Sequence, residues 1–356
     1  MKSGTIIFIY LFLISMYSGA QTSYQFQGRE IAAGTKAHFL IPIVTGHDST
    51  FIPVTVFNGI RKGKTLGITA GIHGYEYAPI IAAQKLIGTI NPRELSGVVI
   101  IVQLAGLESF LGRSPYKSPV DGKNLNRTFP GRKDGSNTEK AAHFISEQII
   151  SRSDFFCDMH SGDAPEDLMS YGAYYRNSSM KTTSDISKAM AVSLGFDHVV
   201  VFNTDGKDYM KKDQASLYCT AEAFKRGIPS IDIECGRLGI LEQNKVDMVE
   251  DAILRLLTHL NFLTGHDKVV LKSPNVISDR IYTPSSFTGI FYPLRKAGDD
   301  VKKGAKLGYL TNYFGEIMQT IYAETDGILL LILGTPPVNK GEDLAVIGKL
   351  QRSGSY

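Results

Sequence analysis

The stretch TLGITAGIHGYE, residues 65–76, carries an apolar strand-like run through a glycine turn into the start of a helical pattern. A strand that ends at such a turn lifts the next polar side chains over the carboxyl end of a sheet, and the helix that follows fixes their direction. The polar side chains here are His73 and Glu76. Imidazole and carboxylate are both good zinc ligands. Because a catalytic zinc needs three protein ligands and one open position, we expect a third ligand elsewhere in the chain.

Strand-like runs and helical patterns continue to alternate from about residue 63 to residue 264. This alternation predicts an α/β fold with a mostly parallel or mixed sheet flanked by helices, in which ligands bind at the carboxyl ends of the strands. The strands are expected at residues 65–70, 98–103, 155–159, 198–202 and 230–234. The helices are expected at residues 77–89, 138–151, 184–194, 215–226 and 241–263.

The pattern changes after residue 265. Short apolar runs are separated there by turns rich in Gly, Pro and Asp, which predicts a small all-β domain over residues 266–356. Its spacing resembles the barrel-sandwich of lipoyl and biotinyl carriers, but EIMQ at residues 316–319, where a carrier has its modified hairpin tip, contains no lysine. We therefore expect this domain to have a structural role or to cover the site.

The N-terminus has the pattern of an export signal. Lys2 precedes an apolar stretch at residues 6–16, and small residues lead to Ala20. The apolar stretch is too short to span a bilayer, so we expect a signal peptide at residues 1–20, with a membrane anchor as the alternative. The mature protein would then be periplasmic or secreted, without stable membrane insertion, and its α/β domain would cover residues 21–265.

Length and composition describe an ordinary globular protein. The chain has 356 residues, of which 43% are hydrophobic and 21% charged, enough for one large and one smaller domain. A net charge of +3 gives no basic stripe of the kind that nucleic-acid-binding modules carry, so the expected partner is a small molecule. The oligomeric state stays open. Cys157, Cys219 and Cys235 lie in or beside apolar runs, and we expect buried free thiols.

The best candidate for the third ligand is His160, in the run DFFCDMHSG at residues 154–162. Like His73, it stands where an apolar strand runs into a Gly-containing loop, so both side chains are expected over one sheet edge. Asp158 lies two residues earlier on the same strand face and is placed to orient a ligand. For His160 alone, a buried histidine with satisfied hydrogen bonds is the alternative. We assign no chemistry to the remaining histidines, which are His38, His47, His143, His198, His259 and His266.

Hydrolysis at zinc also needs a general base, and Glu234 is the candidate. It ends the apolar run SIDIE at residues 230–234, again at the carboxyl end of a strand, where partial burial raises a carboxyl pKa toward the working pH. Asp232 points to the same side of the strand and is the second candidate. A purely structural carboxylate is the alternative.

The loop RSPYKSPVDGKNLNRTFPG, residues 113–131, is dense in polar groups. A guanidinium can bind a substrate carboxylate or stabilise an oxyanion beside the metal, and Asn126 with Arg127 is placed to do one of these. Pro and Gly residues frame the loop, which favours a defined conformation over a solvated tip.

Four motifs in order resemble those of the succinylglutamate desuccinylase and aspartoacylase family, relatives of the zinc carboxypeptidases. They are H-G-x-E at residues 73–76, N-L-N-R-x-F-P-G at 124–131, D-x-H at 158–160 and E-x-G at 234–236. The match covers about residues 66–349. It implies a zinc-carboxypeptidase-like α/β domain followed by a β domain that contributes to the substrate mouth.

The resemblance also implies roles for single residues. The implied ligands of one Zn2+ per chain are His73, Glu76 and His160. The implied catalytic glutamate is Glu234, and the implied substrate-binding pair is Asn126 and Arg127. Arg113 is similar to the arginine that polarises the scissile carbonyl, although the segment from it to Asn126 is longer than in aspartoacylase. The arginine that aspartoacylases place shortly before the catalytic glutamate has no counterpart at its spacing, so specificity for acidic substrates does not carry over.

Together these expectations describe an exported zinc hydrolase that cleaves the amide bond of a small N-acyl amino acid or a related compound. Zinc would acidify a water molecule, Glu234 would take its proton and pass it to the departing amine, and Arg113 would help to stabilise the oxyanion. One alternative is a zinc carboxypeptidase that acts on cell-wall or short peptides. Another is a binding protein without turnover, which the intact Glu234 argues against because a pure binder needs no proton shuttle.

Overall fold

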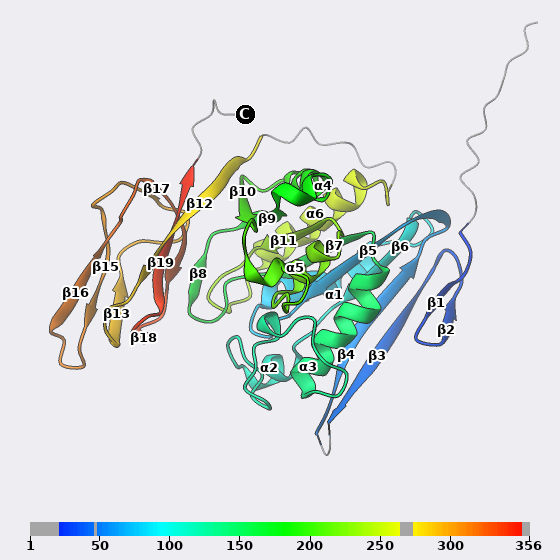
Figure 1. The fold of residues 1–356 in the computed structure, drawn as a ribbon, viewed down its shortest axis with the longest axis horizontal. Helices are drawn as coiled ribbons and strands as arrows, with labels where there is room; N and C mark the ends of the chain where they lie inside the picture. Colours follow the sequence, from blue (N-terminus) through cyan, green and yellow to red (C-terminus); the bar gives the residue numbers. More distant parts are fainter. Residues whose placement is uncertain (1–20, 46–47, 264–272, 351–356) are drawn as a thin grey trace, which may run out of the picture.

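The computed structural model describes residues 21–45, 48–263 and 273–350. The expected signal peptide and the expected domain boundary after residue 265 lie outside these residues. Figure 1 shows a sheet flanked by helices in the first part of the chain and a layered β region in the last part. None of the helices within the described ranges is long and apolar enough to cross a membrane.

The central sheet is mixed, as expected. β7 pairs in parallel with both β5 and β11, and β6 pairs in parallel with β5. β9 is antiparallel to β11 and parallel to β10, and the long β3–β4 hairpin joins the far edge through β6. The strands are β3 (Thr35–Thr45), β4 (Asp48–Asn58), β5 (Arg61–Ala70), β6 (Ser96–Val102), β7 (Phe155–His160), β9 (Tyr171–Arg176), β10 (His198–Asn203) and β11 (Ser230–Glu234), and β1 (Tyr24–Phe26) and β2 (Arg29–Ile31) form a separate hairpin. All five predicted strands are present, whereas β3, β4 and β9 were not predicted.

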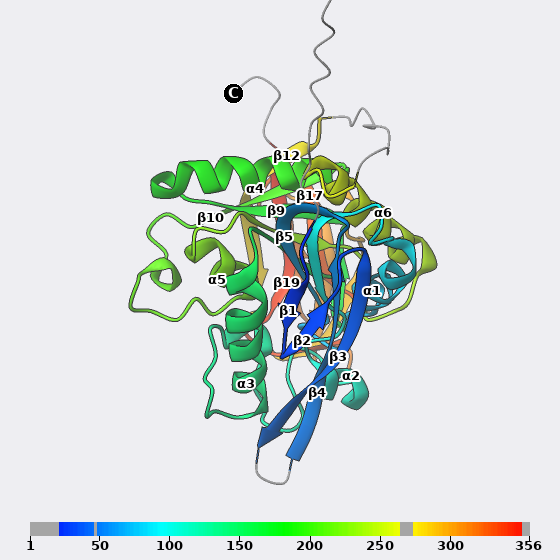
Figure 2. The same cartoon turned by 90° about the vertical axis from the view of Figure 1, so that its right-hand side faces the viewer.

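Helices cover both faces of this sheet. α1, α4 and α6 share one hydrophobic cluster with it, and α3 and α5 share another on the opposite face. Figure 2 shows α1 and α6 on one side of the strands and α3 and α5 on the other. The helices are α1 (Tyr77–Thr89), α2 (Leu107–Gly112), α3 (Asn137–Phe144), α4 (Lys181–Ser193), α5 (Cys219–Lys225) and α6 (Gln243–His259). α3 continues through a π turn at Ile145–Ile149 and a 3₁₀ turn at Ile150–Arg152.

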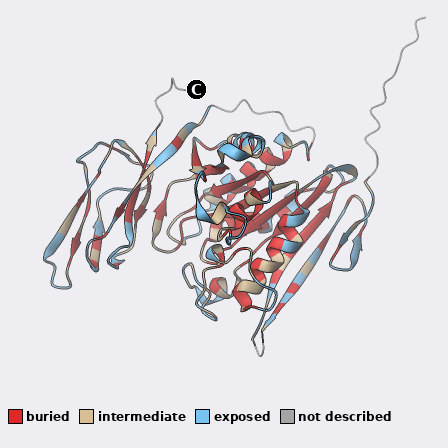
Figure 3. Ribbon diagram, viewed as in Figure 1, coloured by how far each residue is buried: buried red, intermediate tan, exposed pale blue. Residues whose placement is uncertain are grey.

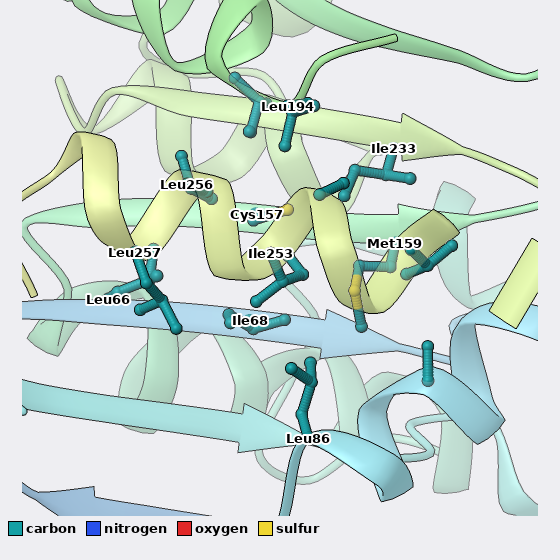
Figure 4. Packing of buried hydrophobic residues seen from close by; sticks show 14 of the residues in the cluster. Leu66, Ile68, Leu86, Cys157, Met159, Leu194, Ile233, Ile253, Leu256 and Leu257 are labelled. Carbon is teal, nitrogen blue, oxygen red and sulfur yellow. The ribbon is translucent and has the colours of Figure 1, made fainter. Parts of the chain in front are cut away.

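Strand alternation separates the apolar core from the polar residues. Cys157 and Met159 of β7 pack beneath Ile253 and Leu256 of α6 (Figure 4). The residue between them, Asp158, points to the opposite face because successive side chains of a strand alternate. Figure 3 shows that buried residues concentrate in these central strands. Burying one such aliphatic side chain contributes roughly 1.5–3 kcal/mol, so this face of the sheet is held firmly while the other can carry polar groups. The three cysteines are buried free thiols, as predicted.

The C-terminal β region is a two-layered sandwich joined to the central sheet by β12. Its strands are β12 (Asn275–Pro284), β13 (Gly289–Pro293), β14 (Asp300–Val301), β15 (Lys306–Thr311), β16 (Ile317–Tyr322), β17 (Gly327–Leu333), β18 (Pro337–Val338) and β19 (Asp343–Leu350). β12 pairs in parallel with β10 and then antiparallel with β19, so the central sheet continues into this region. β8 (Glu166–Leu168), from the loop after β7, pairs with β17. The antiparallel sheet β16-β15-β13-β18 shares a hydrophobic core with β17 and β19.

Candidate active site

Four residues expected to carry chemistry meet at the carboxyl ends of β5, β7 and β11. His160 at the end of β7 lies directly opposite Glu234 at the end of β11. His73 and Glu76 follow β5 in the turn that leads to α1. A Cβ at Gly74 would lie 2.1 Å from a backbone nitrogen of α2, so only glycine lets this turn pack so closely. Parallel pairing of the three strands therefore brings together motifs that are far apart in the sequence.

Glu76 lies between the two histidines. Its carboxylate oxygens are 2.7 Å from His73 Nδ1 and 2.9 Å from His160 Nδ1. All three side chains are buried, and each offers a ligand atom within 4.8 Å of the others. Burial by itself would raise the pKa of Glu76, but the two imidazoles outweigh it and lower that pKa to about 2. The carboxylate is therefore held ionised between two ring nitrogens.

The outer nitrogens of both rings have oxygen partners of their own. His160 Nε2 is 2.9 Å from Asp158 Oδ2, and His73 Nε2 is 3.1 Å from Asn124 Oδ1. The Asn124 oxygen also accepts a backbone N–H from two residues further along the chain, at 2.8 Å, which identifies it as an acceptor. In each neutral ring the outer nitrogen therefore carries the proton, and the inner Nδ1 lone pair faces Glu76.

This arrangement fits a metal ion. Two Nδ1 lone pairs and an anionic carboxylate repel one another unless a proton or a cation lies among them. Burial alone would favour neutral His160, but in the metal-free protein Asp158 and Glu76 outweigh it and hold the His160 pKa well above its usual range. Zinc suits this set of nitrogen and carboxylate donors, and metal-ligating histidines usually donate their outer N–H to an oxygen, as here. The buried set fits one metal ion per chain.

A row of buried polar side chains continues from His160 along the sheet face beneath α5. Thr69 of β5, Asp158 of β7 and Asp232 of β11 are neighbours in register. Thr69 Oγ1 donates to Asp158 Oδ1 at 2.6 Å, and the Thr220 hydroxyl of α5 donates to Asp232. Burial, together with the charge of Asp158, raises the pKa of Asp232 to about 7. Asp158 thus links the His160 ring to the interior of the sheet.

Glu234 shares one cavity with the candidate metal ligands. Burial raises its pKa well above the usual range; the carboxylates of Glu76 and Asp232 act in the same direction, and His160 opposes them. A raised pKa suits a carboxyl group that must both accept and release a proton. Asp232 lines the same cavity, but its carboxylate already accepts the Thr220 hydroxyl.

The cavity has a volume of about 450 Å³, which is typical of a small-molecule site. Its wall is rich in aromatic side chains and includes residues of the C-terminal β region. The aromatic members are Tyr116, Tyr171, Tyr175, Phe202, Tyr209, Tyr218 and Tyr282. The C-terminal members are Arg280, Tyr282 and Leu331.

Asn126 and Arg127, expected to bind substrate, also line this cavity. Asn126 Oδ1 accepts the backbone N–H of Cys219 at 2.9 Å, which ties the loop to the first turn of α5. The Arg127 guanidinium lies 4.7 Å from the centroid of the Tyr218 ring and donates to the Asn126 carbonyl at 2.6 Å. These contacts hold both side chains at the wall by neutral groups, so the arginine charge is available to a ligand.

Arg113 is the expected site residue that the structure does not bring to the cavity. It ends α2 in the left-handed conformation, with φ 48°, and its side chain is exposed. The chain reaches the cavity wall only three residues later, at Tyr116. The described lining residues include Arg127 and Arg280 but not Arg113. This arrangement therefore gives no support to a role for Arg113 at the reacting carbonyl.

Sequence reasoning missed several polar members of the cavity wall, among them Asn124 and Arg280. Asn124 stands in the quoted N-L-N-R motif. Its side chain accepts the backbone N–H of Asn126, and an asparagine is a common signal for this kind of local side-chain cap. Arg280 has no local signal, because it lies in a strand of the C-terminal region beyond the motifs.

Comparison with known proteins agrees with this geometry. Residues 62–260 match the family model of the succinylglutamate desuccinylase/aspartoacylase catalytic domain, which is more than half of the chain. The chain belongs to this family. As a member of the succinylglutamate desuccinylase/aspartoacylase family it is a deacylase, a metal-dependent amidohydrolase, and His73, Glu76 and His160 are its candidate zinc site.

Relatives extend the match over almost the whole chain. The N-alpha-acetyl-L-2,4-diaminobutyric acid deacetylase of Halomonas elongata is 29% identical over 334 residues, which cover 90% of this chain and 94% of that protein. The crystal structure of a succinylglutamate desuccinylase/aspartoacylase from Rhodobacter sphaeroides superposes with a TM-score of 0.78 at 25% identity, covering 89% of this chain and 96% of that one. The product-bound structure of the ectoine utilization protein EutE (DoeB) from Ruegeria pomeroyi shares the fold, with a TM-score of 0.79 at 24% identity over 88% of this chain and 95% of that one.

Proposed function

We propose that the chain is an exported zinc-dependent deacylase that hydrolyses the amide bond of a small N-acyl amino acid or a related compound. The observation that carries the proposal is the buried His73, Glu76 and His160 set, which shares one cavity with Glu234. Membership of the family supports amide hydrolysis. The relative from Halomonas elongata is named as a deacetylase of an N-acetylated amino acid, which supports this class of substrate.

The residues at the strand ends have distinct tasks in this proposal. Zinc supplies a Lewis acid that acidifies water at the site. His73, Glu76 and His160 hold the ion, and Asp158 fixes the His160 ring through its outer nitrogen. Glu234 accepts a proton from the attacking water and then donates it to the amine nitrogen that leaves. Its raised pKa favours the second transfer, in which the carboxyl group donates the proton.

Asn126 and Arg127 position the substrate in this proposal. The Arg127 guanidinium is held by the Tyr218 ring and a backbone carbonyl, so its remaining N–H groups can bind a substrate carboxylate. Fixing the carboxylate holds the amide near Glu234 and reduces the entropy that the reaction must lose. Residues of the C-terminal region line the same cavity, which supports a small substrate over the peptide that a carboxypeptidase would take.

The test combines metal analysis with a substrate panel. The purified chain is expected to contain one zinc ion and to release free amine from N-acyl amino acids, to lose this activity to a chelator and to regain it with zinc. Short peptides serve as the comparison series. Faster release from peptides than from N-acyl amino acids would replace the proposal with a carboxypeptidase, and bound zinc without any hydrolysis would replace it with a binding protein.

Export rests on the N-terminal pattern alone. If residues 1–20 are removed during export, the mass of the protein recovered from its native host corresponds to a chain that begins at Gln21. A recovered chain that retains Lys2 and the apolar stretch would contradict this part of the proposal and leave the proposed chemistry untouched.

A further inference from the structure

Tyr116 brings a hydroxyl group to the part of the cavity beside the candidate metal ligands. The Tyr116 side chain lines the cavity, and its ring meets the His73 ring edge-on with centroids 5.8 Å apart. Other tyrosines of the wall pack elsewhere, as Tyr209 does against Tyr218. Tyr116 thus places a polar aromatic side chain against a residue that is expected to hold the metal.

The backbone at Tyr116 is held in an unfavourable conformation. Its φ is 57°, in the left-handed region that bulky residues rarely adopt. The Tyr116 N–H donates to Asp163 Oδ2 at 2.9 Å, and Asp163 is completely buried in the loop that follows β7. Strained backbone persists only where the surroundings fix it, and it clusters at functional sites. The loop after β7 therefore helps to fix where the Tyr116 side chain points.

The Tyr116 hydroxyl has a carboxyl partner inside the cavity. It forms a hydrogen bond with Glu166, which also lines the cavity. Glu166 Oε2 accepts the Asp163 N–H at 3.0 Å, and the Glu166 carbonyl accepts the Leu238 N–H at 2.7 Å. Both ends of the Tyr116–Glu166 pair are thus tied to the loop after β7, so its geometry is set before any substrate enters.

Protonation of this pair favours a donor in the cavity. Burial, followed by the charges of Glu166 and Asp163, raises the pKa of Tyr116 above its usual range, so its hydroxyl stays protonated. Burial also raises the pKa of Glu166 to about 7; Glu76 and Asp163 act in the same direction through their charges, whereas the Asp163 N–H and His73 oppose them. A protonated Glu166 can donate to the phenol oxygen, which frees the Tyr116 proton for another acceptor.

We propose that Tyr116 is a catalytic residue whose hydroxyl donates a hydrogen bond to the carbonyl oxygen of the scissile amide. The inference rests on the proposed function and gives Tyr116 the task that the sequence suggested for Arg113. As the water oxygen bonds to the carbonyl carbon, an electron pair moves to the carbonyl oxygen, and the hydrogen bond stabilises this charge without transfer of the phenol proton. Glu234 takes the proton of the water and returns it to the amine nitrogen as the carbon–nitrogen bond breaks. Glu166 is a positioning residue that orients the Tyr116 hydroxyl.

Single substitutions separate this role from a structural one. kcat, KM and zinc content are measured for wild type, Tyr116→Phe, Arg113→Gln and the control Tyr174→Phe, with the fastest substrate of the N-acyl amino acid panel. Tyr174 is a buried tyrosine of β9 that does not line the cavity, so Tyr174→Phe reports the loss of a hydroxyl elsewhere. The zinc-loaded variants are also titrated calorimetrically with the methylphosphonamidate analogue of N-acetyl-L-alanine, in which a tetrahedral phosphorus with anionic oxygens replaces the carbonyl carbon.

The expected result is a loss confined to the transition state. Tyr116→Phe lowers kcat and kcat/KM about 100-fold, the scale for losing one oxyanion donor, and changes KM by less than about threefold. Zinc content stays the same, and the methylphosphonamidate binds at least about tenfold more weakly. Tyr174→Phe matches wild type, and Arg113→Gln loses less than Tyr116→Phe because the Arg113 side chain is exposed outside the cavity.

Variants of Glu166 test whether it acts through Tyr116. Glu166→Gln keeps an N–H that can donate to the phenol oxygen, whereas Glu166→Ala keeps no partner, so Glu166→Gln should retain more of kcat. In the Tyr116→Phe background, neither change at Glu166 should lower kcat by more than about a further threefold, because the hydroxyl that it orients is already absent. Losses that simply multiply would refute the positioning role of Glu166.

A loss of less than about threefold in Tyr116→Phe, or loss of its zinc, would overturn the inference and leave the deacylase proposal standing. A larger loss in Arg113→Gln than in Tyr116→Phe would return the role to Arg113. If no compound is hydrolysed, the proposed function fails, and titrations with the methylphosphonamidate and with N-acetyl-L-alanine decide the inference alone. Weaker binding of only the methylphosphonamidate to Tyr116→Phe supports the donor; equal affinity of wild type and Tyr116→Phe for it, or binding to neither, refutes it.

Discussion

The central sheet and the C-terminal β region contribute to one cavity in different ways. The ends of β5, β7 and β11 supply the candidate metal ligands and Glu234, and register and hydrogen bonds within that sheet fix these side chains. The C-terminal region supplies Arg280, Tyr282 and Leu331 to the cavity wall, and none of the described hydrogen bonds joins these three side chains to the metal ligands. The comparison indicates that the chemistry depends on strand pairing in one sheet, whereas recognition depends on where a second region packs. Variants in the two regions should therefore fail in different ways.

The largest effect is expected at Glu234. Glu234→Gln cannot accept a proton, so kcat should fall about 10²- to 10⁴-fold while zinc content and KM change little. Steady-state kinetics with metal analysis check this. The matched control is Asp232→Asn, on the same strand face, which should lose less than about tenfold because a structural hydrogen bond to Thr220 is all that it weakens. A larger loss in Asp232→Asn than in Glu234→Gln would transfer the role of base to Asp232.

The next effect is on metal affinity and comes from Asp158. Asp158→Asn weakens the charged partner of His160 Nε2, so the affinity for zinc should fall about 10- to 100-fold. Competition with a chromophoric chelator measures this affinity. Thr69→Val serves as the control, because it removes only a donor to the other Asp158 oxygen and should have a smaller effect. An unchanged affinity in Asp158→Asn would show that strand register alone orients the ring.

The pH dependence of zinc binding tests the same network. Burial disfavours charged His73 and His160, but their carboxylate neighbours outweigh it and raise both pKa values in the metal-free protein. Zinc must displace these protons, so its affinity should fall as the pH falls, by about tenfold per pH unit for each proton displaced. Calorimetry in two buffers of different ionisation enthalpy counts the protons. Zinc binding without proton release near pH 6 would contradict the assignment.

The same two pKa shifts give the stability of the metal-free fold a pH dependence opposite to that of zinc affinity. A histidine whose pKa is raised on folding stabilises the fold fully below its unfolded pKa of about 6.5, and this contribution is lost as the pH rises through the folded pKa. Denaturant titrations of the metal-free protein should therefore show this contribution shrinking above about pH 6.5, whereas zinc affinity grows over the same range.

The smallest effect is expected in the C-terminal region. Tyr282→Leu removes an aromatic ring from the cavity wall, and KM should rise about two- to tenfold with unchanged kcat and zinc content. Full kinetic curves separate KM from kcat. Loss of zinc or a large fall in kcat in this variant would show that the C-terminal region also supports the chemistry, and the division between the two regions would not hold.

Much of the central sheet could be predicted because apolar residues recur with a different period in its strands and in the helices that cover it. The five predicted strands are present, and His73, His160 and Glu234 gather at their carboxyl ends, because parallel strands place those ends at one sheet edge. β9 was missed because all but its last residue are buried, so no alternation marks it as a strand. β3 does alternate in burial over much of its length, and that period was a usable signal.

Two arginines show what the sequence could not supply. Arg113 resembles the family's carbonyl-polarising arginine, yet it adopts the left-handed conformation at the end of α2, and its side chain is exposed and does not line the cavity. Arg280 belongs to no motif, yet pairing of β12 with β10 places it at the wall. Whether a side chain enters a cavity depends on backbone path and on long-range strand pairing, and neither leaves a local pattern.

The sequence by itself determined the candidate ligand set, the proposed base and the α/β plan of this deacylase. The alternation of residues along a strand and the glycine turn that follows it specify which side chains stand at the strand end. Both can be read from neighbouring residues in the sequence. Only the tertiary structure decided the partners of the outer ring nitrogens, the cavity wall and the arrival of Arg280. These features arise from contacts between segments far apart in the chain, where packing of one region against another sets the geometry.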